Sequence, residues 1–139
     1  MAKAWQTFDH TADIGLAATA DTLGELFEAM AEGLAELICP HRQVAATQTR
    51  QVHVEAEDRE ALAVDFLWQV MSAIQVDHFV VASVWVCDVD DTHVTAKLIG
   101  EPYDPARHEL AVEVKAVTYH QISIAKEDDQ WVARVILDV

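Results

Sequence analysis

Apolar residues recur along the chain with two different periods, and these periods predict its secondary structure. Between residues 23 and 38 they fall three and four positions apart, which is the spacing of one helix face. The helix is expected to begin after Thr22, because Thr22 and Glu25 form a capping box, and to end before Pro40. Asp58 is expected to cap a second helix with the buried face Leu62, Phe66, Leu67, Val70 and Ile74.

The remaining apolar positions mostly alternate with polar ones, which is typical of strands that bury one face. Turn residues at 88–91 and 127–130 predict two hairpins. The predicted strands are residues 14–18, 48–56, 79–87, 93–99, 110–126 and 131–139.

The order of these elements predicts an α+β fold in which two helices cover one side of a largely antiparallel sheet. The order strand, helix, strand recurs in each half and suggests a duplicated β-α-β-β motif, although the halves share no clear residue-level repeat. With 139 residues, of which 52% are hydrophobic, the chain is expected to form a single domain over residues 1–139.

The charge narrows the choice of partners. Lys and Arg number 9 against 24 Asp and Glu, so the formal net charge is −15, which disfavours strong direct binding to nucleic acid. An acidic surface suits cation binding or docking on a basic partner, or it simply keeps the protein soluble.

The cellular compartment follows from what the sequence lacks. Cys39 and Cys87 lie far apart and outside any Cys/His cluster, so free thiols in a reducing cytosol are expected, without a zinc site or a disulfide. The sequence shows neither a secretory h-region at its start nor an apolar run of about 20 residues. We therefore expect a cytoplasmic protein that does not enter a membrane.

Asp13 and Asp138 are the main candidates for metal ligands, because each is an acidic residue in an otherwise apolar strand. A buried carboxylate is costly unless it is paired or metal-bound. If the two strands are neighbours, both carboxylates converge with the C-terminal carboxylate of Val139, and hard oxygens suit Ca²⁺, Mg²⁺ or Mn²⁺. The alternative is an ion pair with Arg134 or Lys115.

Asp9 and His10 are weaker candidates at the same end of the chain. In one extended strand Asp9 and Asp13 would lie about 13 Å apart, so they can bind one ion only if a turn separates them. The alternative is that Asp9 or Thr11 stabilises that turn through bonds to the backbone. For His10, packing or hydrogen bonding is the more common role of such a histidine.

The residues by themselves offer no catalytic constellation. Glu113 and Lys115 would share one face of a strand, which usually means a solvated face, with His120 on the other side. The Asp-rich turn at 88–91 lacks the glycine and the terminal glutamate of a calcium loop. The sequence contains no nucleophile motif, phosphate loop or dinucleotide fingerprint.

Four ordered segments of the chain closely resemble the archease family, and the match to the family covers nearly the whole chain. The middle helix, VDFLWQVMSAIQVD, is a looser match to the leucine-rich version usual in that family. The resemblance implies the archease fold. The four segments are DHTADIGL, TLGELFEAMAEGL, GEPYDPARHELAVEVKAVTYH and WVARVILDV.

The resemblance also implies a function. Archeases are small acidic proteins that activate RtcB-type RNA ligases, which join a 2′,3′-cyclic phosphate or 3′-phosphate end to a 5′-hydroxyl end in tRNA splicing and RNA repair. Family members promote guanylylation of a ligase histidine and multiple turnover, and they bind a divalent metal through acidic residues. The resemblance thus implies a protein cofactor that is not itself an enzyme.

The family's acidic metal ligands correspond to Asp13 and Asp138, with Ca²⁺ expected in vitro and Mg²⁺ or Mn²⁺ as alternatives. Lys115, in the segment EVKAVTY, is a further functional candidate by the same resemblance, whereas His120 can be given no role. The resulting hypothesis is that an acidic tip with Asp13, Asp138 and Lys115 enters or caps the ligase active-site cleft.

Two other functions compete with this one. The chain could be a chaperone-like modulator of an RNA- or DNA-modifying enzyme such as a methyltransferase, with a metal of purely structural role. A free-standing metal-dependent hydrolase is disfavoured, because the chain offers no general base apart from the metal-ligand candidates.

Overall fold

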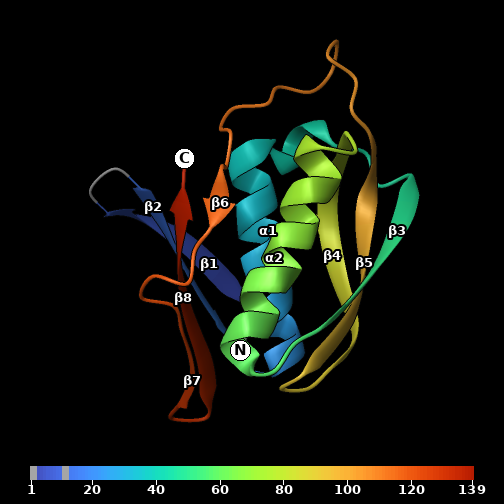
Figure 1. Ribbon diagram of the computed structural model, residues 1–139. Coiled ribbons are helices and arrows are strands. Elements are labelled where there is room, and N and C mark those ends of the chain that lie inside the picture. The colour runs from blue at the N-terminus through green and yellow to red at the C-terminus, as the bar shows by residue number, and fades with distance from the viewer. Residues whose placement is uncertain (1–2, 11–12) are drawn as a thin grey trace.

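Two antiparallel sheets lie on either side of a pair of helices (Figure 1). This computed structural model describes residues 3–10 and 13–139, and of Asp9 and His10 it describes only the backbone. The elements are β1 Ala4–His10, β2 Asp13–Ala20, α1 Leu23–Ile38, the short 3₁₀ helix His41–Gln43, β3 Gln48–Glu55, α2 Arg59–Gln75, β4 Phe79–Val89, β5 His93–Pro102, β6 Ala116–Val117, β7 Ser123–Glu127 and β8 Gln130–Asp138.

The α+β class and both helices are confirmed. The Thr22 hydroxyl accepts a hydrogen bond from the Glu25 N–H at 3.1 Å, and the Asp58 carboxylate accepts one from the Ala61 N–H at 2.8 Å. These bonds satisfy two of the N–H groups that a helix start leaves without a partner. Between the helices, the rings of Phe27 and Phe66 pack with their centres 5.7 Å apart.

The strands form two sheets instead of the single sheet that was expected. Sheet A has the order β1-β2-β8-β6, with β7 also paired to β8, and sheet B has the order β3-β5-β4. One β-α-β-β unit, β3-α2-β4-β5, supplies all of sheet B. Sheet A combines strands from both ends of the chain, with β8 near its centre, so the two terminal regions are neighbours (Figure 1).

The prediction of one strand over residues 110–126 is wrong. Only β6 and β7 are strands there, and Gln121 between them has a left-handed φ of 55°. Val112 and Val114 do alternate with polar residues, but they pack against the hydrophobic core outside any strand. Strand β1, which the sequence pattern did not reveal, pairs with β2 along its whole length.

The free edge of β4 is covered by two carboxylates of α1. Glu28 and Glu32 accept hydrogen bonds from the backbone N–H groups of Val86 at 2.8 Å and Val84 at 3.0 Å. The two glutamates are four helix residues apart, a rise of about 6 Å, and the two valines are two strand residues apart, a rise of about 6.6 Å. The two spacings therefore match. Lys3 lies 3.0 and 3.2 Å from these carboxylates. The edge is thereby blocked against pairing with another strand.

No helix in the described part of the chain is both long and apolar enough to cross a membrane.

Candidate functional site

Asp13 and Asp138 face each other across the pairing of β2 with β8. They are directly opposite in the register, and both are partly exposed. Leu16 and Ala18 alternate into the core, so strand geometry places Asp13 on the other face of sheet A. Side chains at directly opposite positions start about 4.5–5.5 Å apart at Cβ. The two strands are therefore neighbours, as expected, and their register places the two aspartates opposite each other on one face of sheet A.

The other candidates lie at the same end of sheet A, which we call the Asp13–Asp138 end. The Lys115 N–H donates to the Asp138 carbonyl oxygen at 2.7 Å, and Ala116 is opposite Asp138 in the register. Val139 follows Asp138 directly. On the other side, the backbone of His10 is paired with that of Asp13. Asp138 thus has Asp13 on one neighbouring strand and the Lys115 segment on the other.

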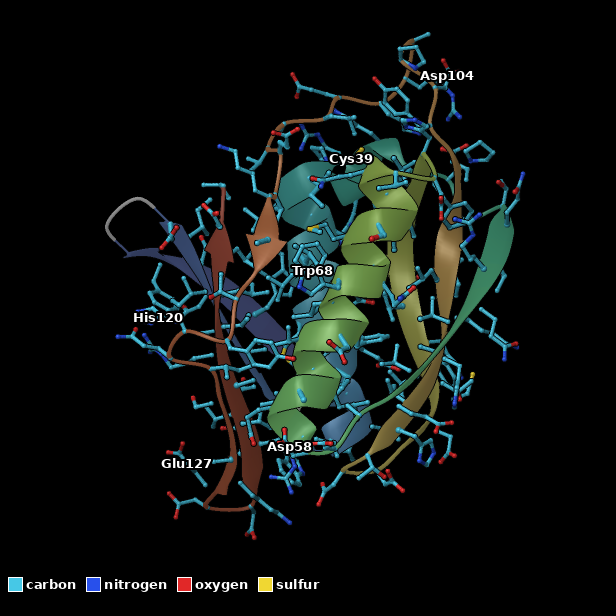
Figure 2. All side chains as sticks on the ribbon, in the orientation of Figure 1. Cys39, Asp58, Trp68, Asp104, His120 and Glu127 are labelled. Atoms are coloured by element: carbon cyan, nitrogen blue, oxygen red, sulfur yellow. The ribbon has the colours of Figure 1, made fainter. Side chains whose placement is uncertain are left out.

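Some predictions about this end fall outside the described part of the structure. The structure does not describe the side chains of Asp9 and His10, or any part of Thr11. The roles of these residues as metal ligands or turn residues therefore stay predictions. The backbone of Asp9 pairs with Ile14, which shows that Asp9 and Asp13 lie on two different strands. His120 is exposed, on the segment between β6 and β7 (Figure 2).

Arg134 was considered as an ion-pair partner for the aspartates, but it has another contact. Its guanidinium lies over the ring of Phe8, 4.2 Å from the ring centre. The same ring covers Gly15, since a Cβ built on Gly15 would lie 2.1 Å from the Phe8 Cζ. Gly15 is therefore required for this close approach. The sequence analysis did not predict this packing of Arg134, Phe8 and Gly15 near the aspartates. A glycine within a strand could have indicated it, because such a glycine often marks a close contact.

The donor set at the Asp13–Asp138 end fits a hard divalent cation with open coordination positions. Carboxylates directly opposite each other repel, and a cation between them removes that cost. Among the side chains that the structure describes, those of residues 3–8 and 13–139, no group of three or more His, Cys, Asp or Glu is able to hold a metal. The two described carboxylates would therefore leave room for water and for ligands from elsewhere.

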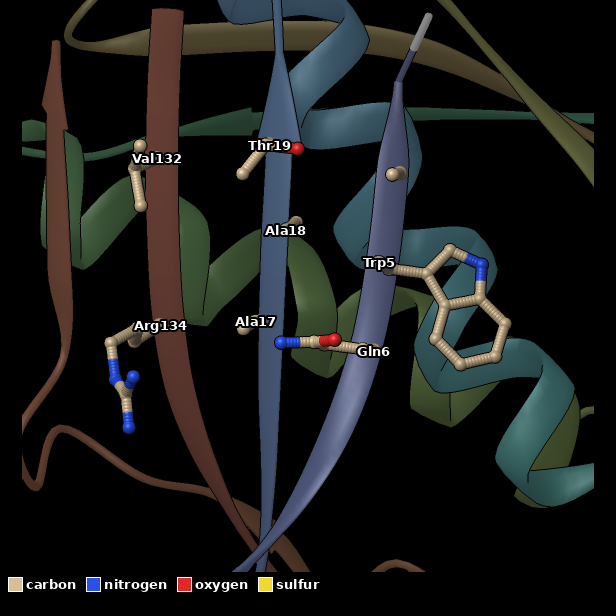
Figure 3. Close-up of a pocket in the computed structure, with 8 residues that line it drawn as sticks. Trp5, Gln6, Ala17, Ala18, Thr19, Val132 and Arg134 are labelled. Atoms are coloured by element: carbon tan, nitrogen blue, oxygen red, sulfur yellow. The ribbon is translucent and has the colours of Figure 1, made fainter. Parts of the chain in front are cut away.

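A shallow cavity of about 340 Å³ lies on the same face of sheet A. Its lining residues are drawn in Figure 3, and the β2–β8 register places them farther along the strands from the aspartates. Gln6 and Arg134 flank a floor formed by Ala17. Trp5 points away from it toward α1, where it packs on Gly33. The lining offers no acid, thiol or histidine, so this cavity is not the candidate site.

Glu101 anchors the loop that leads to Lys115. Its buried carboxylate receives two hydrogen bonds from Arg107, at 3.0 and 2.6 Å, one from the Ala45 N–H at 2.8 Å, and one from His108 Nε2 at 2.8 Å. His108 Nδ1 accepts from the Asp104 N–H, so the ring carries its proton on Nε2. The loop lies above the helix ends (Figure 2). Sequence reasoning quoted this segment but gave these residues no role.

These bonds lower the pKa of Glu101 to about 2, the Arg107 bonds first and the Ala45 N–H next. A lowered pKa stabilises the fold fully above the ordinary pKa of 4.5, and this stabilisation is lost as the pH falls from there to about 2. We expect Glu101→Gln to lower the melting temperature by several degrees at pH 7, and the difference from wild type to shrink toward pH 2.

Thermal unfolding between pH 2 and pH 7 checks this prediction. Glu113→Gln, at an exposed position of the same loop, is the matched control and should follow wild type throughout. A constant difference between Glu101→Gln and wild type at every pH would contradict the proposed ionisation.

Comparisons with known proteins agree with one another. The profile of the archease protein family matches residues 5–139. The archease of Pyrococcus abyssi is 37% identical and that of Methanosarcina barkeri 32%; these alignments cover 99% of this chain and 99% and 97% of those proteins.

Two solved structures are similar in fold. The solution structure of protein 1598 from Methanobacterium thermoautotrophicum has a TM-score of 0.79 and 35% identity, covering 97% of this chain and 98% of that one. The crystal structure of a Thermotoga maritima protein, described as an archease and possible chaperone, has a TM-score of 0.59 and covers 96% of each chain. At 19% identity this second likeness shows the fold alone.

Proposed function

The chain belongs to the archease family, and from that premise we propose that it activates an RtcB-type RNA ligase through its Asp13–Asp138 end. The observation that carries the proposal is the direct opposition of the two aspartates on β2 and β8. Directly opposite carboxylates repel each other, and a divalent cation bound between them would offset that repulsion. In this proposal, a cation bound between the two aspartates acts on the partner ligase.

A divalent metal at this end would be held by the carboxylates of Asp13 and Asp138, with the C-terminal carboxylate of Val139 as the expected third group. Bound there, it supplies positive charge of the kind that offsets negative charge on phosphates. The chain itself contributes the position of these oxygens, which the β2–β8 register determines. Lys115 adds a second positive charge at the same end, on an exposed segment.

The overall charge supports docking on a ligase. A net charge of −15 favours approach to a basic cleft built for RNA and nucleotide, and it disfavours competition by this protein for the RNA. In this proposal the ligase performs the chemistry, and the chain promotes guanylylation of the ligase and repeated turnover as a cytoplasmic accessory protein.

The test is multiple-turnover joining of a 3′-phosphate RNA to a 5′-hydroxyl RNA by the cognate RtcB-type ligase, with GTP and Mn²⁺, with and without this protein. We expect product to exceed one equivalent of ligase only when the protein is present, together with a higher yield of guanylylated ligase. Product limited to a single turnover in both cases would reject the proposal.

The second candidate function is a chaperone-like modulator of an RNA- or DNA-modifying enzyme. The description of the Thermotoga maritima relative as a possible chaperone favours it. A protector increases the amount of soluble partner, whereas an activator increases the turnover of partner that is already folded. Measuring soluble ligase alongside product in the same reactions separates the two.

A further inference from the structure

Helix α2 holds the segment before and within β6 by two of its side chains. The Trp68 indole N–H donates to the Val117 carbonyl oxygen at 3.1 Å. The Gln75 carboxamide binds both backbone groups of Val114, donating to its carbonyl at 2.8 Å and accepting from its N–H at 2.8 Å. Gln75 therefore supplies the donor and the acceptor that a neighbouring strand would otherwise supply to Val114.

The spacing of the two side chains matches the segment they hold. Trp68 and Gln75 are two helical turns apart, so they lie on one face of α2 and about 10.5 Å apart along its axis. Three residues of extended chain, from Val114 to Val117, cover about 10 Å. Trp68 is on the side of α2 that faces β6 (Figure 2). We call these two contacts the α2 clamp.

The opposite side of the same segment is bound to β8. Lys115 donates its N–H to the Asp138 carbonyl, and Thr118 donates both its N–H, at 3.1 Å, and its hydroxyl, at 2.9 Å, to the Ile136 carbonyl. Strand β6 has only two residues, and so short a strand pairs weakly by itself. The α2 clamp therefore adds three hydrogen bonds, on the side away from β8, to those that keep Lys115 next to Asp138.

We propose that Trp68 and Gln75 are positioning residues for Lys115, which they hold at the Asp13–Asp138 end for contact with the partner; this rests on the proposed function. Asp13 and Asp138 lie on two full-length strands that pair with each other, so their separation does not depend on β6. The α2 clamp thus affects the action of Lys115 and leaves the carboxylate pair in place.

The variants that remove the clamp are Gln75→Met, which keeps the length of the side chain, and Trp68→Phe, which keeps an aromatic ring. Their matched controls are Gln69→Met, at an exposed position of the same helix, and Trp85→Phe, at a position 62% exposed on sheet B. All four are compared with wild type at a temperature well below their melting points.

Amide hydrogen exchange provides the first measurement. Losing both bonds of Gln75 is expected to speed exchange at the Lys115 N–H about tenfold or more, while the amides between β2 and β8 keep wild-type rates. Unchanged exchange at Lys115 in both clamp variants would overturn the inference, whatever the ligase does.

Ligase stimulation with the same variants provides the second measurement. We expect Gln75→Met to reduce stimulation about tenfold while the affinity for Mn²⁺, measured by calorimetry, stays within about twofold. In a Lys115→Ala background, Gln75→Met should cause no further loss, because it acts through Lys115. A purely structural role would instead give additive losses, and that result, or full stimulation despite fast exchange, would overturn the inference. Absence of stimulation by wild type would reject the proposed function instead.

Discussion

Replacing Asp13 with asparagine is expected to weaken divalent-cation binding at the proposed site strongly and to relieve the repulsion between residues 13 and 138 in the metal-free protein. The amide removes one of two opposed negative charges and keeps the shape of the side chain. Relief of like-charge repulsion across a strand pair is worth about 0.2–1 kcal/mol. Loss of one of the two proposed carboxylate ligands should weaken binding of Mn²⁺ or Ca²⁺ by about 100-fold, because charge count sets affinity at oxygen sites.

Calorimetric titration with Mn²⁺ and Ca²⁺, together with melting temperatures with and without metal, measures both effects. Asp138→Asn should behave in the same way, since the two residues are opposite each other. Glu127→Gln makes the same change of charge at the far end of the same sheet and should leave metal binding unaltered. An Asp13→Asn protein that binds metal normally, or that stimulates the ligase fully, would refute the proposed metal site.

Replacing Gly100 with alanine is expected to cost about 3 kcal/mol or more of unfolding free energy, as overpacking against rigid neighbours does. A Cβ built on Gly100 would lie 1.8 Å from the Val80 carbonyl oxygen and 3.0 Å from the Val81 Cα. These are backbone atoms of β4, and Gly100 is in β5, the central strand of sheet B. The methyl group can therefore be accommodated only by moving one strand away from the other.

Urea unfolding followed by circular dichroism measures this change. Gly24→Ala is the matched control, because a Cβ there meets nothing closer than 3.7 Å, at the Val86 Cγ1. Within helix α1, alanine in place of glycine should stabilise by up to about 1 kcal/mol. Equal stabilities for Gly100→Ala and wild type would show that β4 and β5 tolerate a wider separation than the structure has.

The local features of the fold were predictable from the sequence. Helix α1 begins at the predicted cap, Thr22, and ends at Ile38 before Pro40, because capping and a 3.6-residue period depend only on nearby residues. The hairpin of β7 and β8 was likewise predictable from its acidic turn, where Asp128 and Asp129 both have positive φ. The prediction of one strand over residues 110–126 was wrong because alternation of apolar and polar residues is not unique to strands. Val112 and Val114 alternate with polar residues but pack against the core from a loop.

The candidate site was predictable in part. Asp13 and Asp138 stood out as acidic residues in apolar strands, but the pattern of each strand could not establish that the two strands pair. The register matters as much as the pairing, since a shift of one residue would place Asp138 opposite Ile14 and on the other face of the sheet. Their roles as ligands, like that of Lys115 toward a partner, stay predictions for the experiments above.

The sequence by itself determined the helices, most of the other strands apart from β1 and the 110–126 region, the acidic charge and the family pattern. Each of these depends on a few neighbouring residues or on the overall composition. Only the tertiary structure decided the division into two sheets, the opposition of Asp13 and Asp138, and the α2 clamp. The clamp contacts join residues 49 and 39 positions apart, from side chain to backbone. Such contacts leave no periodic trace in a sequence, since a backbone carbonyl or N–H is present at almost every residue.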